Sequence, residues 1–131
     1  MKLTIRDLMT GVETLGKLVR LNMKAKLAYH VGRNARIVKT ELAEINKIQN
    51  ALFVKYGDKQ EDNNYVVPIE KVELFSAERE ELLDQEIDID IRPFSFDLFG
   101  DMEIPAETYV NLWYMFTEEP KDGLEPEIQE K

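Results

Sequence analysis

Apolar residues recur at helical spacing in the first twenty residues of the chain. Their steps of three and four predict an amphipathic helix over about residues 4–21, with one apolar stripe formed by Leu8, Val12, Leu15 and Val19. Thr4 and Asp7 have the spacing of a capping box, which places the start of this helix at Thr4. Gly11 and Gly16 each cost a helix up to about 1 kcal/mol relative to alanine, so either another element packs closely against them or they are tolerated small residues.

The strongest pattern is a heptad repeat over residues 24–56. Proline is absent there and Gly57 stands at the expected C-cap, so we predict one helix of about 33 residues and about 50 Å. A helix of that length needs cover from another helix or from a second copy of the chain. The repeat consists of Ala28, Val31, Ala35, Val38, Leu42, Ile45, Gln49, Leu52 and Tyr56. We call Val31, Val38, Leu42, Ile45 and Leu52 the seam, and self-association through it is one hypothesis.

The second half of the chain predicts short mixed elements. Residues 57–64 form a polar turn, and residues 65–67 are a short strand that Pro68 ends. Residues 70–85 predict a helix with Leu74, Phe75, Leu82 and Leu83 on its apolar face. Residues 86–92 alternate strictly between acid and isoleucine, which predicts a strand, and residues 105–116 predict a last helix.

These elements predict an α+β fold. Its parts are an N-terminal helical hairpin with one long heptad-patterned helix, a small β element and two further short helices. One domain spans residues 1–117, and an acidic, proline-broken tail spans residues 118–131. We expect packing onto the hairpin through Leu74, Phe75, Leu82, Ile87, Ile89, Ile91, Phe94, Phe96 and Trp113.

The formal net charge of −9 hides a division of the 131-residue chain into two halves. Residues 1–56 carry eleven basic and four acidic side chains, a net of +7, whereas residues 57–131 carry six and twenty-two, a net of −16. The two halves either neutralise each other or present surfaces of opposite sign. The basic face comprises Lys17, Arg20, Lys24, Arg33, Arg36 and Lys39, and the acidic row comprises Asp84, Glu86, Asp88 and Asp90.

Each charged group admits more than one interpretation. The basic face has the cations that phosphate binding needs, but it has no base-stacking aromatic or known reading motif, so direct nucleic-acid binding is not expected. The acidic row is most simply a solvated strand face. Contact with a basic surface and a divalent cation site are its alternatives. As a nucleic-acid mimic, the acidic half would inhibit a host DNA-binding or defence protein.

Catalytic chemistry has little support in this sequence. There is no cysteine, and the one histidine, His30, would need Ser76 or Ser95 folded against it to form a triad. The glycines are scattered and form no phosphate loop, so we expect no enzyme, cofactor or metal. No apolar run approaches the about 20 residues of a membrane span, and the first residues lack a signal-peptide core, so no membrane partner is expected.

Aromatic side chains crowd the last predicted helix and occupy more than one of its faces. Tyr109, Leu112, Trp113 and Phe116 would share the apolar face that packs on the core. Packing of the whole cluster in the core is the simpler interpretation. Tyrosine and tryptophan are favoured anchors of protein interfaces, so Trp113 and Tyr114 are interaction candidates if part of the cluster, such as Tyr114, is exposed.

Three segments carry a resemblance to a known group of proteins. They are LAYHVGRNARIVKTELAEINKIQNALFVKYGDKQEDNNYVV, FSAEREELLDQEIDIDI and FDLFGDMEIPAETYVNLWYMF, and with the first helix they cover about residues 3–116. The chain resembles a family of short uncharacterised proteins encoded by tailed bacteriophages and prophages. The resemblance implies a phage source, residence in the host cytoplasm or virion, and a non-enzymatic protein. We expect a protein partner, itself included, and a role as an assembly or virion accessory factor.

Overall fold

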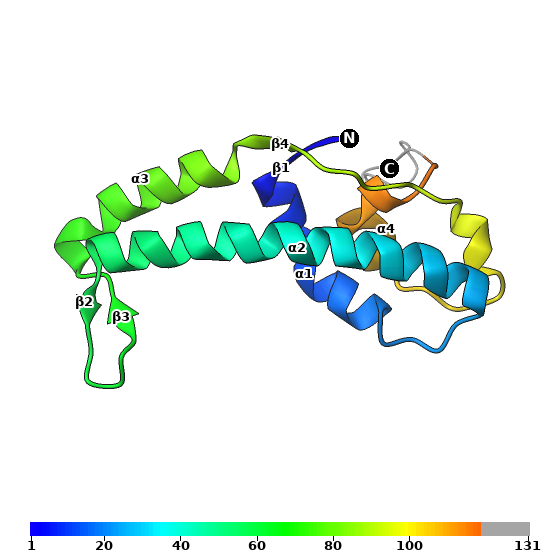
Figure 1. Cartoon of the computed structure of the whole chain (residues 1–131), viewed down its shortest axis with the longest axis horizontal. Coiled ribbons are helices and arrows are strands. Elements are labelled where there is room, and N and C mark those ends of the chain that lie inside the picture. Colours follow the sequence, from blue (N-terminus) through cyan, green and yellow to red (C-terminus); the bar gives the residue numbers. More distant parts are fainter. Residues whose placement is uncertain (119–131) are drawn as a thin grey trace, which may run out of the picture.

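Helix α2 (Ala25–Tyr56) runs the length of the molecule and organises everything else (Figure 1). The computed structural model describes residues 1–118. We call residues 46–83 the arm, which holds the C-terminal part of α2 and the elements packed on it. The remaining described residues, 1–45 and 84–118, form the head. The predicted acidic tail lies outside the described residues except for Glu118.

Helix α1 (Ile5–Leu18) begins as predicted and ends three residues early. Thr4 and Asp7 form the capping box, with backbone-to-side-chain hydrogen bonds of 3.1 and 3.0 Å. Close packing is confirmed at Gly11, where a Cβ would lie 2.8 Å from the Asn111 carbonyl oxygen. Gly16 fits the alternative of a tolerated small residue, since a Cβ there would meet nothing within 4 Å.

The acid–isoleucine alternation forms a strand, but a shorter one than predicted. Strand β4 (Glu86–Asp88) pairs antiparallel with β1 (Lys2–Thr4), and Leu3 lies opposite Ile87. Just beyond the ladder, the Ile89 N–H donates to the Met1 carbonyl oxygen at 2.8 Å. The alternation still holds beyond the strand, since Ile89 and Ile91 are buried.

The arm consists of the end of α2, a β-hairpin and α3 (Val72–Leu83), which runs back along α2 (Figure 1). The hairpin pairs β2 (Asp58–Lys59) with β3 (Tyr65–Val66), within the segment predicted as a turn and short strand. A 3-10 turn, η1 (Ile69–Lys71), leads into α3, which begins two residues after the predicted start. Leu74 was expected on the apolar face of this helix, but it is 61% exposed because α3 turns Leu83 toward the interior instead.

The predicted helix over residues 105–116 breaks into two pieces. Helix α4 (Ala106–Asn111) ends where Leu112 leaves helical geometry at φ −118° and ψ 30°, and a 3-10 turn, η3 (Trp113–Met115), follows. Another 3-10 turn, η2 (Phe96–Phe99), precedes α4. A single β-bridge joins Phe94 to Phe116 and brings the end of the described chain onto the core.

The hydrophobic core lies almost entirely in the head. Of the nineteen buried apolar residues, only Leu52 and Leu83 belong to the arm, so the arm has few buried apolar side chains of its own. The α+β fold with a helical N-terminal region and one long helix is confirmed. Within residues 1–118, no helix has both the length and the apolar character that a membrane crossing requires.

Candidate protein-interaction surface

The seam lies inside the molecule and not on its surface. Val31, Val38 and Ile45 are no more than 2% exposed and belong to the core. Leu42 is partly buried against that core, and Leu52 is 8% exposed. Helices α1 and α3 both pack on α2, so the chain itself supplies the cover that the heptad pattern requires. Self-association through the seam stays a prediction, and these contacts would have to open for it to occur.

Acids of the second half neutralise part of the basic face. Arg33 forms an ion pair with Asp90 at 3.0 Å, and Lys17 lies 3.7 Å from Glu107. The other members of the face, Arg20, Lys24, Arg36 and Lys39, have exposed side chains and no ion pair within the described chain. The six predicted cations therefore do not act as one uniform patch.

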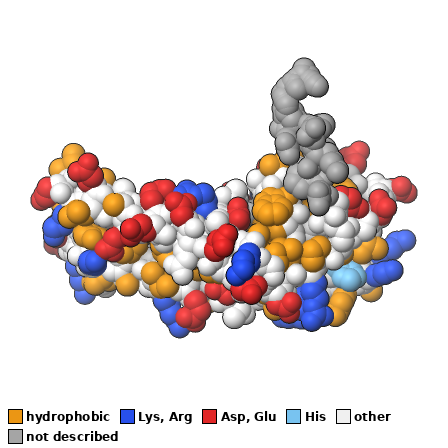
Figure 2. All heavy atoms as spheres, turned by 90° about the horizontal axis from the view of Figure 1, so that it is seen from above, with side chains coloured by type: hydrophobic (Ala, Val, Ile, Leu, Met, Phe, Trp, Pro, Cys, Tyr) orange, Lys and Arg blue, Asp and Glu red, His pale blue; other side chains and the backbone are white. Residues whose placement is uncertain are grey.

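The acidic row is likewise divided among cations of the same chain. Asp84 binds Arg6 at 3.0 Å, Asp88 binds the Met1 amine at 3.2 Å, and Asp90 binds Arg33. Glu86 is exposed. Among residues 1–118, no cluster of three or more His, Asp or Glu side chains has the arrangement of a metal site. Figure 2 shows acidic and basic side chains interspersed along one face of the molecule. Three of the four acids of the row therefore pair with cations of the N-terminal half of the same molecule.

Two cations that the sequence did not single out fasten the arm to the head and to itself. Arg6 of α1 donates to Glu80 and Asp84, and these hydrogen bonds raise the pKa of its guanidinium. At the far end, Lys55 and Tyr56 both donate to the Glu78 carboxylate, which holds the pKa of Glu78 below its ordinary value. Sequence reasoning missed these contacts because the partners are 22 to 78 residues apart.

The two candidate aromatic anchors differ in exposure. Tyr114 is 2% exposed, which agrees with the core interpretation and not with an exposed anchor, and burial raises the pKa of its phenol. Trp113 was assigned to the apolar face but is 38% exposed. The cause is the break at Leu112, because the 3-10 turn that follows rotates each later side chain away from its α-helical direction.

His30 and the two serines occupy separate environments. The His30 ring stacks on Phe94 with centroids 5.4 Å apart, and its other ring neighbour is Tyr29. The Ser95 hydroxyl donates to Glu118 and accepts the Asp97 N–H. Ser76 is exposed on α3. The structure therefore does not bring these three residues together as a triad.

Exposed apolar side chains gather at the end of the arm, and the sequence reasoning did not predict this surface. Fourteen large hydrophobic side chains are exposed in the described chain, and the arm, which has little core, holds seven of them. Ile69 is 88% exposed and Leu74 61%. Ile48 lies further back on α2, and the rest form what we call the arm-end patch: Phe53, Val54, Val66, Ile69, Val72 and Leu74.

The arm-end patch arises where four elements meet, namely α2, β3, η1 and α3, because two packed helices cover only one side of each other. Phe53 and Phe75 pack across the α2–α3 contact with ring centroids 5.0 Å apart. Val54 lies on the next position of α2, and Val66 and Ile69 lie on the connection between the helices. The available signal in the sequence was the apolar content of residues 66–75, which lack a helical or alternating period.

Exposed apolar side chains that gather on one part of a folded chain make that part a candidate docking site for a protein or ligand. The end of the arm lies away from the head and its core, at the left of Figure 1, so a partner can approach it from several directions. In comparisons with known proteins, no protein family, no curated protein and no solved structure matches the chain. The surface is therefore interpreted from the chemistry of its own residues.

Proposed function

We propose that this chain is a non-enzymatic protein–protein interaction protein that docks its partner on the end of the arm. The observation that carries the proposal is the arm-end patch, six large apolar side chains each at least 38% exposed and far from the core. Removing such surface from water provides the main favourable free energy of protein association. Because most buried apolar residues lie in the head, the arm end is left available for this task.

The charge arrangement favours this reading over nucleic-acid mimicry. A mimic needs a face of uncompensated negative charge, whereas Asp84, Asp88 and Asp90 each lie within 3.2 Å of a cation from the N-terminal half. Two of the six cations of the basic face, Lys17 and Arg33, also pair with acids of the same chain, which leaves fewer cations for phosphate contacts. Apolar docking is therefore the better supported mode of interaction.

The partner we propose belongs to a bacteriophage. The long helix ending in Lys55-Tyr56-Gly57, the polar turn and the acid–isoleucine strand resemble those of short tailed-phage proteins, and this resemblance supports a phage source. An elongated chain with a self-contained head and an apolar arm end suits an assembly or virion accessory factor. Such a factor would act in the host cytoplasm or the virion and would bind another phage protein or a second copy of itself.

Affinity capture with matched surface variants tests the proposal. The immobilised full chain is compared with the double variant Ile69→Ser/Leu74→Ser and with Val110→Ser, which alters a head side chain that is 57% exposed. Lysates of phage-infected host cells are captured at low and high salt, and bound proteins are identified by mass spectrometry. We expect a virion or assembly protein to bind wild type and Val110→Ser at both salt concentrations and to be lost from the double variant.

Two results would contradict the proposal. The first is equal capture of every partner by wild type and the double variant. The second is salt-sensitive capture of host nucleases or polymerases alone, which would favour the acidic mimic. Circular dichroism of each variant shows whether a loss of capture reflects the surface or the fold.

A further inference from the structure

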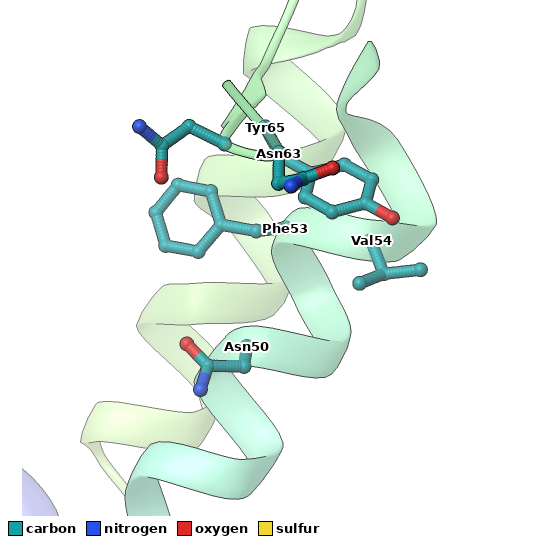
Figure 3. Close-up of a pocket in the computed structure, with 6 residues that line it drawn as sticks. Asn50, Phe53, Val54, Asn63 and Tyr65 are labelled. Carbon is teal, nitrogen blue, oxygen red and sulfur yellow. The ribbon is translucent and has the colours of Figure 1, made fainter. Parts of the chain in front are cut away.

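A shallow pocket of about 430 Å³ opens at the end of the arm between α2 and the β-hairpin. Figure 3 shows that Asn50, Phe53 and Val54 project from α2, whereas Asn63 and Tyr65 come from the hairpin. Asn64 completes the lining. The pocket shares Phe53 and Val54 with the arm-end patch, so it lies within the surface that we propose for docking.

Local sequence builds this pocket. Gly57 continues the chain from α2 in an extended conformation, and a Cβ there would lie 2.5 Å from the Phe53 carbonyl oxygen and 3.1 Å from the Tyr65 Cβ. Only glycine therefore lets the hairpin leave α2 this tightly. Asn63 adopts a positive φ of 70°, a conformation that asparagine tolerates better than most residues, and this reverses the chain toward Tyr65.

The lining combines apolar surface with neutral amides. Phe53, Val54 and Tyr65 provide a site for one aliphatic or aromatic side chain. The Asn50 and Asn63 amides have no hydrogen-bond partner in the part of the chain that the structure describes, and the Asn64 amide donates to Asp62 at 3.0 Å. Each asparagine amide offers both a donor and an acceptor, which is the hydrogen-bonding pattern of a peptide group.

Charge around the pocket narrows the choice of ligand. No charged side chain lines it, so it offers no partner for the phosphate of a nucleotide or the carboxylate of a metabolite. The adjoining residues 58–64 carry three acids, Asp58, Glu61 and Asp62, against one lysine, Lys59. All four side chains are exposed. A ligand with an apolar centre and positive charge beside it complements this arrangement.

We propose that this pocket binds an extended peptide segment of the partner protein, in which one large apolar side chain is flanked by lysine or arginine. The apolar side chain contacts Phe53, Val54 and Tyr65, and the asparagine amides bond the peptide backbone. The flanking cations lie against the acids of the hairpin. This inference rests on the proposed function and specifies the chemistry of the partner.

Titration of the isotope-labelled full chain with synthetic peptides, followed by NMR, tests the pocket. The probe is a nine-residue blocked peptide with a central leucine and a lysine on each side; its counterparts have a central serine or flanking glutamates. We expect the leucine–lysine peptide to shift the resonances of pocket residues. Either change should weaken binding about tenfold or more, through loss of a buried side chain or through charge repulsion. Equal binding of all three peptides, or shifts confined to the head, would overturn the proposal.

Two asparagine variants separate the pocket from the rest of the arm. Asn50→Ala removes a pocket amide and should weaken the leucine–lysine peptide about fivefold. Asn46 lies one turn earlier on the exposed side of α2 and outside the pocket, so Asn46→Ala should leave the affinity for the leucine–lysine peptide unchanged. Equal effects of the two variants on peptide affinity would overturn the proposal that the peptide binds in this pocket.

The capture experiment distinguishes failure of the pocket from failure of the proposed function. Ile69 and Leu74 lie outside the pocket. If Ile69→Ser/Leu74→Ser loses the partner while Asn50→Ala retains it fully, peptide binding in the pocket is contradicted and docking at the arm end still stands. If both variants retain the partner, peptide binding in the pocket and docking at the arm end are both contradicted. If both variants lose the partner, both proposals are supported.

Discussion

The Asn34 side chain pairs with the backbone of Arg92 through two hydrogen bonds, each 3.0 Å long. Its amide nitrogen donates to the Arg92 carbonyl, and its amide oxygen accepts the Arg92 N–H. Asn34 is fully buried on α2, and the segment it holds carries Ile91 and Phe94 into the core. One amide thus holds the backbone at Arg92, beyond the β1–β4 pairing that ends at Asp88.

Asn34→Ala should lower the free energy of unfolding by about 2–4 kcal/mol, because it leaves a buried N–H and a buried carbonyl without partners. Urea unfolding of the purified variant measures the loss. The exposed residue Asn46 on the same helix provides the control, and Asn46→Ala should change stability by less than about 0.5 kcal/mol. Similar values for the two variants would show that the Asn34–Arg92 pairing contributes little.

The two glycines of α1 should respond to alanine in opposite directions. Gly11→Ala places a methyl group 2.8 Å from the Asn111 carbonyl oxygen and the Leu112 side chain, so we expect a net loss of about 1–3 kcal/mol. Gly16→Ala meets nothing within 4 Å and should gain about 0.5–1 kcal/mol from helix propensity. Thermal unfolding compares both with wild type. A stabilised Gly11→Ala protein would contradict the close α1–α4 packing.

The far end of the arm should lose stability in acid through Glu78. Lys55 and Tyr56 depress the pKa of Glu78 in the folded chain, so its stabilising contribution is complete above the ordinary glutamate value of 4.5. As pH falls from that value through the lower folded pKa, the carboxylate gains a proton and the contribution disappears. Urea unfolding of wild type and Glu78→Gln between pH 7 and pH 2 should show a difference that shrinks below about pH 4.5.

Glu73→Gln on the same helix is the control for this titration. Glu73 is exposed and makes no ion pair within the described residues, so its substitution should leave the pH profile of wild type unchanged. A stability difference between wild type and Glu78→Gln that stays constant down to pH 2 would contradict the role of the Lys55–Glu78–Tyr56 contact.

The local elements were predictable where a pattern is continuous within one segment. The capping box at Thr4, the extent of α2 and the inward isoleucines of residues 87–91 follow from spacing alone. The break at Leu112 and the exposure of Leu74 did not follow, because tertiary packing decides which side of a short helix is covered. Asn34 also escaped notice, since nothing in its sequence neighbours indicates a bond to a residue 58 positions away.

The charge pattern indicated the candidate surface only in part. The sequence does divide into a basic and an acidic half. In the fold, however, ion pairs such as Arg33–Asp90 and Arg6–Asp84 join acids of one half to cations of the other. The arm-end patch emerged only when the hairpin and the start of α3 were placed beside α2. Its members come from four elements, and no single stretch of sequence contains a pattern that joins Phe53, Ile69 and Leu74.

The arm should exchange its amide hydrogens faster than the head. Between residues 46 and 83 only Leu52 and Leu83 are buried apolar residues, and segments with few buried contacts open at lower free energy. Native-state hydrogen exchange should find the first turns of α3 least protected among the helices and the core-facing side of α1 most protected. Equal protection of the two would contradict the division into head and arm.

Docking at the arm end is tested most directly by the affinity of the captured partner for three forms of the chain. The dissociation constants of wild type, Ile69→Ser/Leu74→Ser and Val110→Ser are measured by titration calorimetry with the purified partner. We expect the double variant to bind at least about tenfold more weakly, since it removes two large exposed side chains from the contact, and Val110→Ser to match wild type. Equal dissociation constants for all three forms would contradict the assignment of the arm end as the docking surface.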